Sequence, residues 1–359
     1  MPWYDGHVKE NTMSIYLYRG GENLVGRSGV GQAIRHQEDI LTRCGLTVTD
    51  RFAPDTDAVH INTVLPDSVV TALLARLRGR KVVWYGHSTM EDFRGSFRGS
   101  DLLSPLFRRW ITFCYGLGDV VLTPTPYSRR LLAGYGLRKP VYSLSNGVDT
   151  DFFHPDPAAK EAFRRRYGLK TDEKAVISVG HTIARKGLPE FLELARKIPD
   201  VRFLWFGWTD PRLIPAEITQ AIRNAPPNVL FPGFVDRKRL REAYQGADMF
   251  AFFSHEETEG IVVLEALACG IPTVLRDIPV YEGWLEDGKT VYKASNTGEF
   301  QRIVMDFLEG NLPDLTAAGR QAAEERSLEA VGERLKDIYR RERILPPLPA
   351  SMLRCHAKA

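Results

Sequence analysis

Two glutamates, Glu257 and Glu265, stand with seven residues between them in a segment that predicts a loop running into a helix. A carboxylate is a strong paired acceptor for sugar hydroxyls. The free backbone N–H groups of a helix N-terminus form an anion site, and here they fall near Gly260, Ile261 and Val262. Together these chemistries suit a ligand that carries both phosphates and sugar rings, which is a nucleotide sugar.

The elements around the pair place it at a sheet edge. Residues 247–254 form a mostly apolar run of strand length, residues 256–260 are polar and turn-like, and residues 261–267 follow a helical period. Gly270 and Pro272 end that helix before the next strand begins. The loop therefore lies at the carboxyl end of a parallel strand, where open α/β sheets bind ligands. Taken singly, each glutamate is better explained as a solvated charge, but three acidic residues crowded before an apolar run favour a functional site.

Cations follow another predicted strand, residues 175–179. Arg185 and Lys186 come after it, with Gly180 and Gly187 on either side. Two cations near a helix start can neutralise a departing diphosphate. The alternative is an ordinary basic pair on the surface, which the flanking glycines make less attractive.

A glycine loop, Gly26 to Gly31, follows the first predicted strand and opens a helix over about residues 32–44. Glycines here, including Gly29 and Gly31, let the backbone approach a phosphate or sugar closely. The loop lacks the third glycine of the dinucleotide fingerprint, and no acidic residue stands in the ribose position, which weakens a dehydrogenase hypothesis.

Strands and helices alternate along two α/β halves, which predicts parallel βαβ units. The sequence divides into an extension (1–12), an N-terminal domain (13–147), a C-terminal domain (148–325), a last helix (326–343) and a tail (344–359). Met13 is a second candidate start. Expected strands cover residues 14–18, 47–49, 58–62, 81–85 and 120–123, then 175–179, 202–206, 229–231, 247–254 and 273–275.

His87 follows the strand over residues 81–85, again at a carboxyl end. An imidazole there can hydrogen-bond a hexose, or it can simply satisfy a turn. Glu91 and Asp92 come next, in a loop where they would contact acceptor hydroxyls or remain solvated.

Basic residues concentrate between Arg76 and Lys139, a stretch of net charge +8 in a chain of net charge +3. Such a stretch indicates an anionic partner surface. Apolar residues at helical spacing lie beside two of the arginines, as in an interfacial helix with an aromatic anchor. A core-packing helix explains them equally well, and no recognition motif favours nucleic acid. The expected membrane-facing residues are Leu103, Phe107, Arg108, Arg109 and Trp110.

Several motifs resemble one known family. Residues 257–266, Glu-Thr-Glu-Gly-Ile-Val-Val-Leu-Glu-Ala, resemble the signature of retaining glycosyltransferases of family 4, which have the GT-B fold. Residues 28–31, 145–149 and 179–187 resemble the family's glycine loop, inter-domain motif and phosphate-binding loop. Residues 86–97, 123–128 and 203–207 are similar to Gram-positive enzymes that add a second hexose to monoglucosyl-diacylglycerol.

The resemblance implies two Rossmann-like, doubly wound parallel-sheet domains facing a central cleft, with the last helix crossing back to the first domain. It implies that His87 contacts the donor sugar near its 6-position, that Glu257 orients the hexose, and that Glu265 binds ribose. Lys186 matches the family lysine, whereas His181 stands where the family usually has arginine, so Arg185 is expected to replace that charge. The backbone of Gly233, Phe234 and Val235 is expected at the uracil.

The implied reaction moves a hexose from UDP-glucose or UDP-galactose to a membrane glycolipid, by front-face attack with retention and without metal or other cofactor. His87, Glu257 and Lys186 are the expected catalytic residues. A soluble or polyprenyl-linked acceptor is an alternative within the enzyme class. An inactive GT-B relative acting as a membrane-binding module is an alternative outside it, although such a copy need not keep these residues.

Length and composition agree with this hypothesis. The 359 residues fit two domains, and an apolar fraction of 43% fills two cores. Four scattered cysteines argue against a disulfide framework or a zinc site and fit a reducing cytosol. No apolar stretch approaches the roughly 20 residues that span a bilayer. We therefore expect a cytoplasmic protein, peripheral on the inner leaflet of the cell membrane.

Overall fold

Two six-stranded sheets organise the chain, and every strand pairs in parallel with its neighbours. The structure, a computed structural model, describes residues 13–21, 29–97 and 99–346. The predicted extension (1–12), Gly26, Ser28 and most of the tail (347–359) lie outside them. The strands of the first sheet are β1 (Ser14–Tyr18), β2 (Thr47–Thr49), β3 (Ala58–Ile61), β4 (Lys81–Tyr85), β5 (Val120–Thr123) and β6 (Val141–Ser143), in the spatial order β2-β1-β3-β4-β5-β6.

The second sheet follows the same plan. Its strands are β7 (Lys174–Val179), β8 (Val201–Phe206), β9 (Val229–Gly233), β10 (Met249–Phe252), β11 (Thr273–Arg276) and β12 (Tyr292–Ala294), in the order β12-β11-β10-β7-β8-β9. Central strands such as β3, β5 and β10 are buried at every residue. That burial explains their continuous apolar sequences, because both faces of a parallel sheet are covered.

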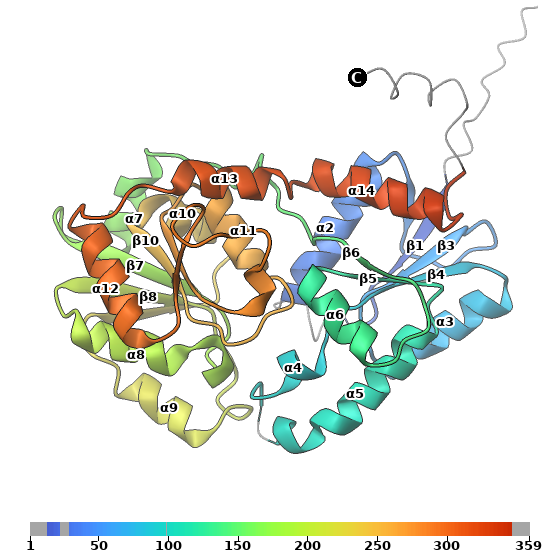
Figure 1. Cartoon of the computed structure of the whole chain (residues 1–359), viewed down its shortest axis with the longest axis horizontal. Coiled ribbons are helices and arrows are strands. Elements are labelled where there is room, and N and C mark those ends of the chain that lie inside the picture. The colour runs from blue at the N-terminus through green and yellow to red at the C-terminus, as the bar shows by residue number, and fades with distance from the viewer. Residues whose placement is uncertain (1–12, 22–28, 98, 347–359) are drawn as a thin grey trace, which may run out of the picture.

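Helices cover both faces of each sheet (Figure 1). The N-terminal half contains α2 (Gly29–Arg43), α3 (Pro66–Leu77), α4 (Met90–Phe93), α5 (Ser100–Gly116) and α6 (Pro126–Gly134). The rest of the chain contains α7 (Ala159–Tyr167), η1 (Ala184–Lys186), α8 (Leu188–Lys197), α9 (Ala216–Arg223), α10 (Arg237–Gly246), α11 (Ile261–Ala268), η2 (Pro279–Tyr281), α12 (Thr297–Leu308), α13 (Thr316–Glu324) and α14 (Leu328–Arg341).

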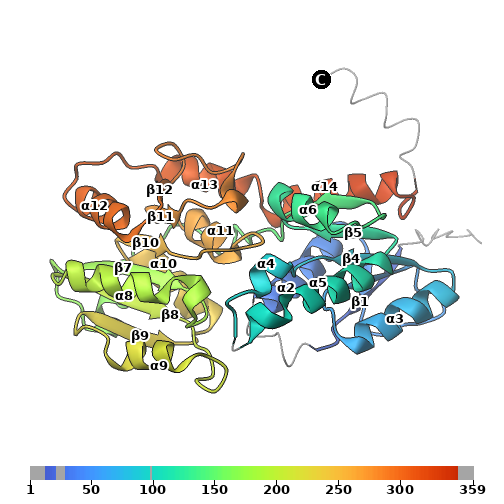
Figure 2. The same ribbon diagram turned by 60° about the horizontal axis from the view of Figure 1, so that its bottom comes forward.

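The last helix, α14, packs on the N-terminal sheet. Its buried residues Leu328, Val331, Leu335 and Tyr339 share a core with Ile15 of β1. A parallel bridge between Val148 and Ser327 ties the chain together where it enters α14. The two halves lie side by side in both views, with α13 and α14 running across one side (Figures 1 and 2). The C-terminal segment therefore helps to hold one half against the other.

The prediction of two α/β halves with parallel sheets is confirmed. The break expected near Arg326 and Ser327 separates α13 from α14. Two strands, β6 and β12, are absent from the expected set, and the strand expected over residues 247–254 is shorter, because only 249–252 pair as β10. No helix within the described ranges is both long and apolar enough to cross a membrane.

Candidate active site

The loop between β10 and α11 carries the two predicted glutamates, and it is fixed to the turn after β7. The backbone N–H of His255 donates to the carbonyl of Arg185 at 2.8 Å. The hydroxyl of Ser254 lies 3.5 Å from the same carbonyl oxygen of Arg185 and 3.1 Å from the carbonyl oxygen of Glu256. These bonds bring the acidic loop and the basic turn η1 together at the carboxyl ends of neighbouring strands, as the sequence predicts.

Two glycines make this approach possible. Gly187 ends η1 with φ +77°, and a Cβ there would lie 2.3 Å from Cβ of Phe253, so no side chain fits. Gly260 precedes α11 with φ +89°, in the left-handed region that favours glycine. The chain can therefore turn sharply from the acidic loop into α11, which starts at Ile261 and Val262.

Lys186 and Glu257 form a buried ion pair between Nζ and Oε1. Glu257 is only 6% exposed. Burial alone would raise the pKa of Glu257, but the charges of Lys186 and Arg185 outweigh it and hold the pKa below its ordinary value. Glu257 is therefore an ionised acceptor at neutral pH, not a proton donor.

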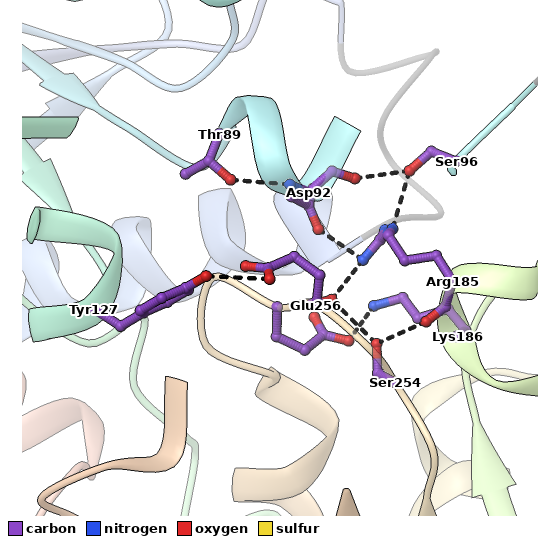
Figure 3. Close-up of polar contacts among 9 residues, drawn as sticks. Thr89, Asp92, Ser96, Tyr127, Arg185, Lys186, Ser254 and Glu256 are labelled. Atoms are coloured by element: carbon purple, nitrogen blue, oxygen red, sulfur yellow. Dashed lines mark hydrogen bonds and ion pairs between the residues drawn. The ribbon is translucent and has the colours of Figure 1, made fainter. Parts of the chain in front are cut away.

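Arg185 reaches from the C-terminal half to the N-terminal half (Figure 3). Its Nη1 lies 2.7 Å from Oδ1 of Asp92 in α4, and its Nε donates to the hydroxyl of Ser96 at 3.0 Å. Nη1 also donates to the carbonyl of Glu256 at 2.7 Å. The expected phosphate-binding cation is thus held by a residue of the expected acceptor loop.

Glu256, for which the sequence predicts no role, lies beside this network. It accepts a hydrogen bond of 3.1 Å from the hydroxyl of Tyr127 in α6, and its Oε1 is buried with no partner among the described residues. Burial raises its pKa to about 7, and the negative charges of Asp92 and Glu91 add to the rise, although the bond from Tyr127 opposes it. Glu256 therefore changes charge near neutral pH.

Glu265 lies one helical turn inside α11 and is 4% exposed. The hydroxyl of Tyr244 donates to its Oε2 at 3.2 Å. Burial raises its pKa to about 7, and the nearby charges of Arg237 and Arg35 partly oppose the rise. Arg35 belongs to α2, so the N-terminal half also contributes to the surroundings of this glutamate.

A third buried glutamate, Glu259, joins the same loop to the inter-domain motif. Its Oε2 accepts hydrogen bonds from Asn146, at 3.0 Å from the backbone N–H and 2.8 Å from the side chain. Thr125 of the N-terminal half also donates to the carbonyl of Thr258 at 2.9 Å. The acidic loop is therefore fastened to both halves.

His87 is buried in the N-terminal half, directly after β4. Its Nε2 lies 2.9 Å from Oδ1 of Asn62, which also accepts from Nε2 of Gln37 at 2.6 Å. Its ring stacks on Tyr85 with centroids 5.1 Å apart. Burial lowers its pKa to about 3, so the imidazole is neutral at physiological pH.

The other expected donor-binding residues lie at the same sheet edges. Gly29 and Gly31 form the first turn of α2, and Gly233 ends β9 before Phe234 and Val235. His181 follows β7, and its Nδ1 lies 3.2 Å from the carbonyl of Trp208. Burial lowers the pKa of His181, and the charge of Lys186 lowers it further. This histidine therefore cannot supply the cation that Arg185 and Lys186 provide.

On the acceptor side, the side chains of Glu91 and Asp92 contact different partners. Asp92 pairs with Arg185, whereas Glu91 accepts a hydrogen bond from the hydroxyl of Tyr135. Both belong to the short helix α4, whose N-cap Thr89 accepts from the N–H of Asp92 at 3.1 Å.

The expected membrane-facing residues divide between two faces of α5. Leu103 is exposed, as is Arg109, and Arg108 is half-buried. Phe107 and Trp110 instead pack toward the core: Phe107 stacks on Phe93, and Nε1 of Trp110 donates to the carbonyl of Val64 at 2.6 Å. The prediction that Phe107 and Trp110 face outward as an aromatic anchor is therefore wrong. The exposed apolar side chains are Leu102, Leu103, Leu106 and Phe113.

Sequence reasoning missed several polar residues of this region. Ser96 and Tyr127 lie inside two of the motifs that carry the family resemblance, residues 86–97 and 123–128, and that position could have marked them as site residues. Asn62 directly follows the strand β3, at the same sheet edge as His87, and that position was the clue to it. The described residues contain no group of three or more His, Cys, Asp or Glu that could hold a metal ion.

Comparisons with known proteins identify the class of protein that this fold and site define. Residues 159–326 match the family of glycosyl transferases group 1, and residues 46–152 match glycosyltransferase family 4. The chain is 37% identical, over 91% of its length and 98% of the relative's, to a processive diacylglycerol alpha-glucosyltransferase of Acholeplasma laidlawii. The chain belongs to the group 1/family 4 glycosyltransferases of the GT-B fold.

Two further similarities are more distant. An alpha-galactosylglucosyldiacylglycerol synthase of Streptococcus pneumoniae is 26% identical, with 94% of this chain and 92% of that protein covered. The crystal structure of Anabaena HepE with UDP and glucose superposes with a TM-score of 0.71 at 16% identity, covering 91% of this chain and 99% of that one. The latter likeness confirms the predicted GT-B fold.

Proposed function

We propose that this glycosyltransferase moves a hexose from UDP-glucose or UDP-galactose to a membrane glycolipid such as monoglucosyl-diacylglycerol. The observation that carries the proposal is the buried Lys186–Glu257 pair beside Arg185, at the junction of β10 and α11. Cations and an ionised carboxylate side by side suit a pyrophosphate next to a hexose. The names of the two glycolipid-synthesising relatives supply the acceptor class.

In the proposed mechanism, Lys186 and Arg185 neutralise the charge that develops on the leaving diphosphate. The bond between C1 of the hexose and the phosphate oxygen breaks, and the acceptor hydroxyl attacks C1 from the same face. The hydroxyl proton passes to the departing phosphate oxygen. Because the acceptor attacks from the face that the phosphate leaves, the anomeric configuration is retained. Glu257 positions the hexose by accepting hydrogen bonds from its hydroxyls, because its lowered pKa keeps the carboxylate ionised.

The neutral ring of His87 would hydrogen-bond the hexose, and Glu265 would bind the ribose in its ionised form. Gly233, Phe234 and Val235 would meet the uracil. UDP is already a good leaving group, so positioning and electrostatic stabilisation carry most of the rate. We propose that the reaction needs no metal. Full turnover after treatment with EDTA would support this, and loss of turnover restored by Mg²⁺ or Mn²⁺ would refute it.

Membrane attachment is proposed through the exposed apolar residues of α5 and the basic stretch around them. Leu102 is 86% exposed and Leu106 is 65% exposed, which is costly unless they meet another surface. Anionic headgroups attract nearby Lys and Arg by about 1 kcal/mol each. The location that follows is the inner leaflet of the cell membrane.

The proposal is tested by incubating the protein with UDP-glucose or UDP-galactose and monoglucosyl-diacylglycerol, and by measuring both UDP release and lipid product. A new diglycosyl lipid with an α-linkage from one donor is the expected result. Product on soluble or polyprenyl-linked sugars alone would favour the alternative acceptor. Neither UDP release nor product with any pairing would favour a membrane-binding module without activity.

A further inference from the structure

A pocket of about 580 Å³ lies between α4, α5 and α6, outside the site described above. Three arginines line it, Arg94, Arg108 and Arg109, together with the hydroxyl-bearing Thr112 and Tyr135. No acidic side chain is among its lining residues. A hollow with this lining selects an anion.

The three arginines carry charge that no carboxylate balances within residues 13–21, 29–97 and 99–346. Arg94 donates from Nε to the hydroxyl of Ser104 at 3.0 Å, and Arg108 donates to the carbonyl of Gly134 at 2.9 Å. Both bonds are to neutral groups and fix the side chains without neutralising them. Arg109 makes neither a hydrogen bond nor an ion pair to any described residue.

Guanidinium groups present several N–H donors in a fixed fork that matches phosphate geometry. The ring of Tyr135 lies under Arg108, with the guanidinium carbon 4.7 Å from the ring centroid, which sets the plane of that fork. Two held arginines and one free arginine around a single hollow therefore fit a phosphate group.

The pocket opens beside the exposed apolar stripe of α5. Leu102, Leu106, Arg109 and Phe113 are spaced by three or four residues, so they share one side of the helix. Leu102, Leu106 and Phe113 are exposed, and Arg109 also lines the pocket. Arg109 therefore lies at the border between this stripe and the pocket. A phosphate in the pocket would thus lie level with apolar side chains, as the phosphate of a phospholipid does at a membrane surface.

The pocket also borders the acceptor loop. Met90, the first residue of α4, is one of its lining residues, and the N–H of Met90 donates to the hydroxyl of Tyr135 at 2.8 Å. That hydroxyl donates in turn to Glu91, next to Asp92 and its partner Arg185. An occupant of the pocket would therefore touch the residues that hold α4 in place.

We infer that this pocket binds the phosphate of an anionic phospholipid headgroup, separately from the glycolipid acceptor. The inference rests on the proposed function for its membrane. It adds a stereospecific site to a surface that would otherwise attract anionic lipid only by diffuse charge. Occupancy would fix both the docking of α5 and the position of α4.

The test is a vesicle flotation assay with the full chain and the variant Arg109→Lys, which keeps the charge but loses the fork. Vesicles carry either phosphatidylglycerol or oleate, at equal surface charge, in phosphatidylcholine. Arg109→Lys is expected to weaken binding about tenfold on phosphatidylglycerol, the value of one charge-assisted hydrogen bond, and to leave binding on oleate within twofold. The matched control is Arg129→Lys on α6, an exposed arginine outside the pocket lining, which should change neither.

Equal behaviour of Arg109→Lys and wild type on both vesicles would overturn the inference, because diffuse charge then explains all binding. Equal losses on both vesicles would overturn it as well. A soluble-phosphate site is the third outcome: inorganic phosphate would saturate the pocket in calorimetry while vesicle binding ignored Arg109, and this too contradicts the inference. Turnover of wild type on detergent-solubilised glycolipid is measured separately. If there is no turnover but Arg109→Lys still weakens binding only on phosphatidylglycerol vesicles, the proposed function is refuted and the pocket inference stands.

Discussion

Nη1 of Arg185 lies 2.7 Å from Oδ1 of Asp92, and this ion pair joins the two halves of the molecule. The same guanidinium is also bonded to Ser96 and to the carbonyl of Glu256. Protein groups thus accept from the N–H groups of Arg185 that, in the proposed function, would bind the pyrophosphate. A nucleotide sugar must compete with Asp92 for Arg185, and its binding would release α4.

Asp92→Asn is therefore expected to strengthen binding of UDP about three- to tenfold in calorimetry, because the competing charge is lost. The matched control is Glu282→Gln, which breaks the exposed inter-domain pair with Arg130 (3.0 Å) but leaves Arg185 as it is. The control should change the affinity less than twofold. Weaker UDP binding by Asp92→Asn would show that Asp92 orients Arg185 for phosphate instead of competing with it.

The pair of Lys186 and Glu257 predicts a non-additive stability cycle. Each single variant, Lys186→Met or Glu257→Gln, leaves a buried charge unpaired and should cost about 3 kcal/mol in unfolding free energy. The double variant removes both charges and should recover most of that loss, while transferase activity stays at least about a hundredfold below wild type. The measurements are urea unfolding and UDP release. Additive losses in the double variant would contradict a direct interaction, and retained turnover would contradict the catalytic roles.

The raised pKa of Glu265 predicts pH dependence with a defined sign. Its pKa is about 7 in the folded protein against 4.5 in a model carboxyl, so the native state binds the extra proton between these values. Glu265 should then lower the unfolding free energy by about 3 kcal/mol as pH rises from 4.5 to above 7. Glu265→Gln should remove this contribution and leave the fall that the raised pKa of Glu256 causes, whereas the exposed control Glu217→Gln should change neither. Identical slopes for Glu265→Gln and wild type in urea titrations would refute the shifted pKa.

The same group predicts donor affinity in the opposite direction. Because ribose hydroxyls bind the ionised carboxylate best, the affinity for a UDP-hexose should rise between pH 6 and 8 in wild type. A UDP-hexose is the right probe, since its diester phosphates do not titrate in this range. Glu265→Gln should bind more weakly and show a flat profile in calorimetry. A rise that persisted in this variant would assign the pH dependence elsewhere, for example to Glu256.

The exposed apolar residues of α5 predict membrane attachment. Leu102→Ser with Leu106→Ser should weaken binding to anionic vesicles at least about tenfold, because burying a leucine is worth about 1.5–3 kcal/mol. The melting temperature should not change, since both side chains are already in solvent. Leu213→Ser is the control: it is 54% exposed and lies in the other half. Equal losses for the control and the double variant would mean that α5 is not the attachment surface.

Much of the fold could be predicted because its central strands are continuous apolar runs between turn residues. The bounds expected for β1, β2, β4 and β5 agree with the structure. β6 and β12 are edge strands of three residues each, too short for a periodic signal. For α5, apolar residues occur on both the core side and the solvent side, so one helical period could not tell which face carries Phe107 and Trp110.

The site could be predicted in part for a related reason. Lys186 and Glu257 each follow a strand of the same sheet, and strand order brings such loops together. The pair of Asp92 and Arg185 joins residues far apart in sequence and in different halves, so it depends on how the halves sit together. The shifted pKa values of Glu256 and Glu265 depend on the burial of their side chains, which the residue types alone do not reveal.

The most direct test of the central claim is the transfer of labelled hexose from UDP-hexose to monoglucosyl-diacylglycerol by wild type, Glu257→Gln and the exposed control Glu217→Gln. We predict one labelled diglycosyl lipid for each UDP released by wild type and the control, and almost none with Glu257→Gln. Lipid product formed at an unchanged rate by Glu257→Gln would contradict the account, because the sugar would then be held away from the junction of β10 and α11.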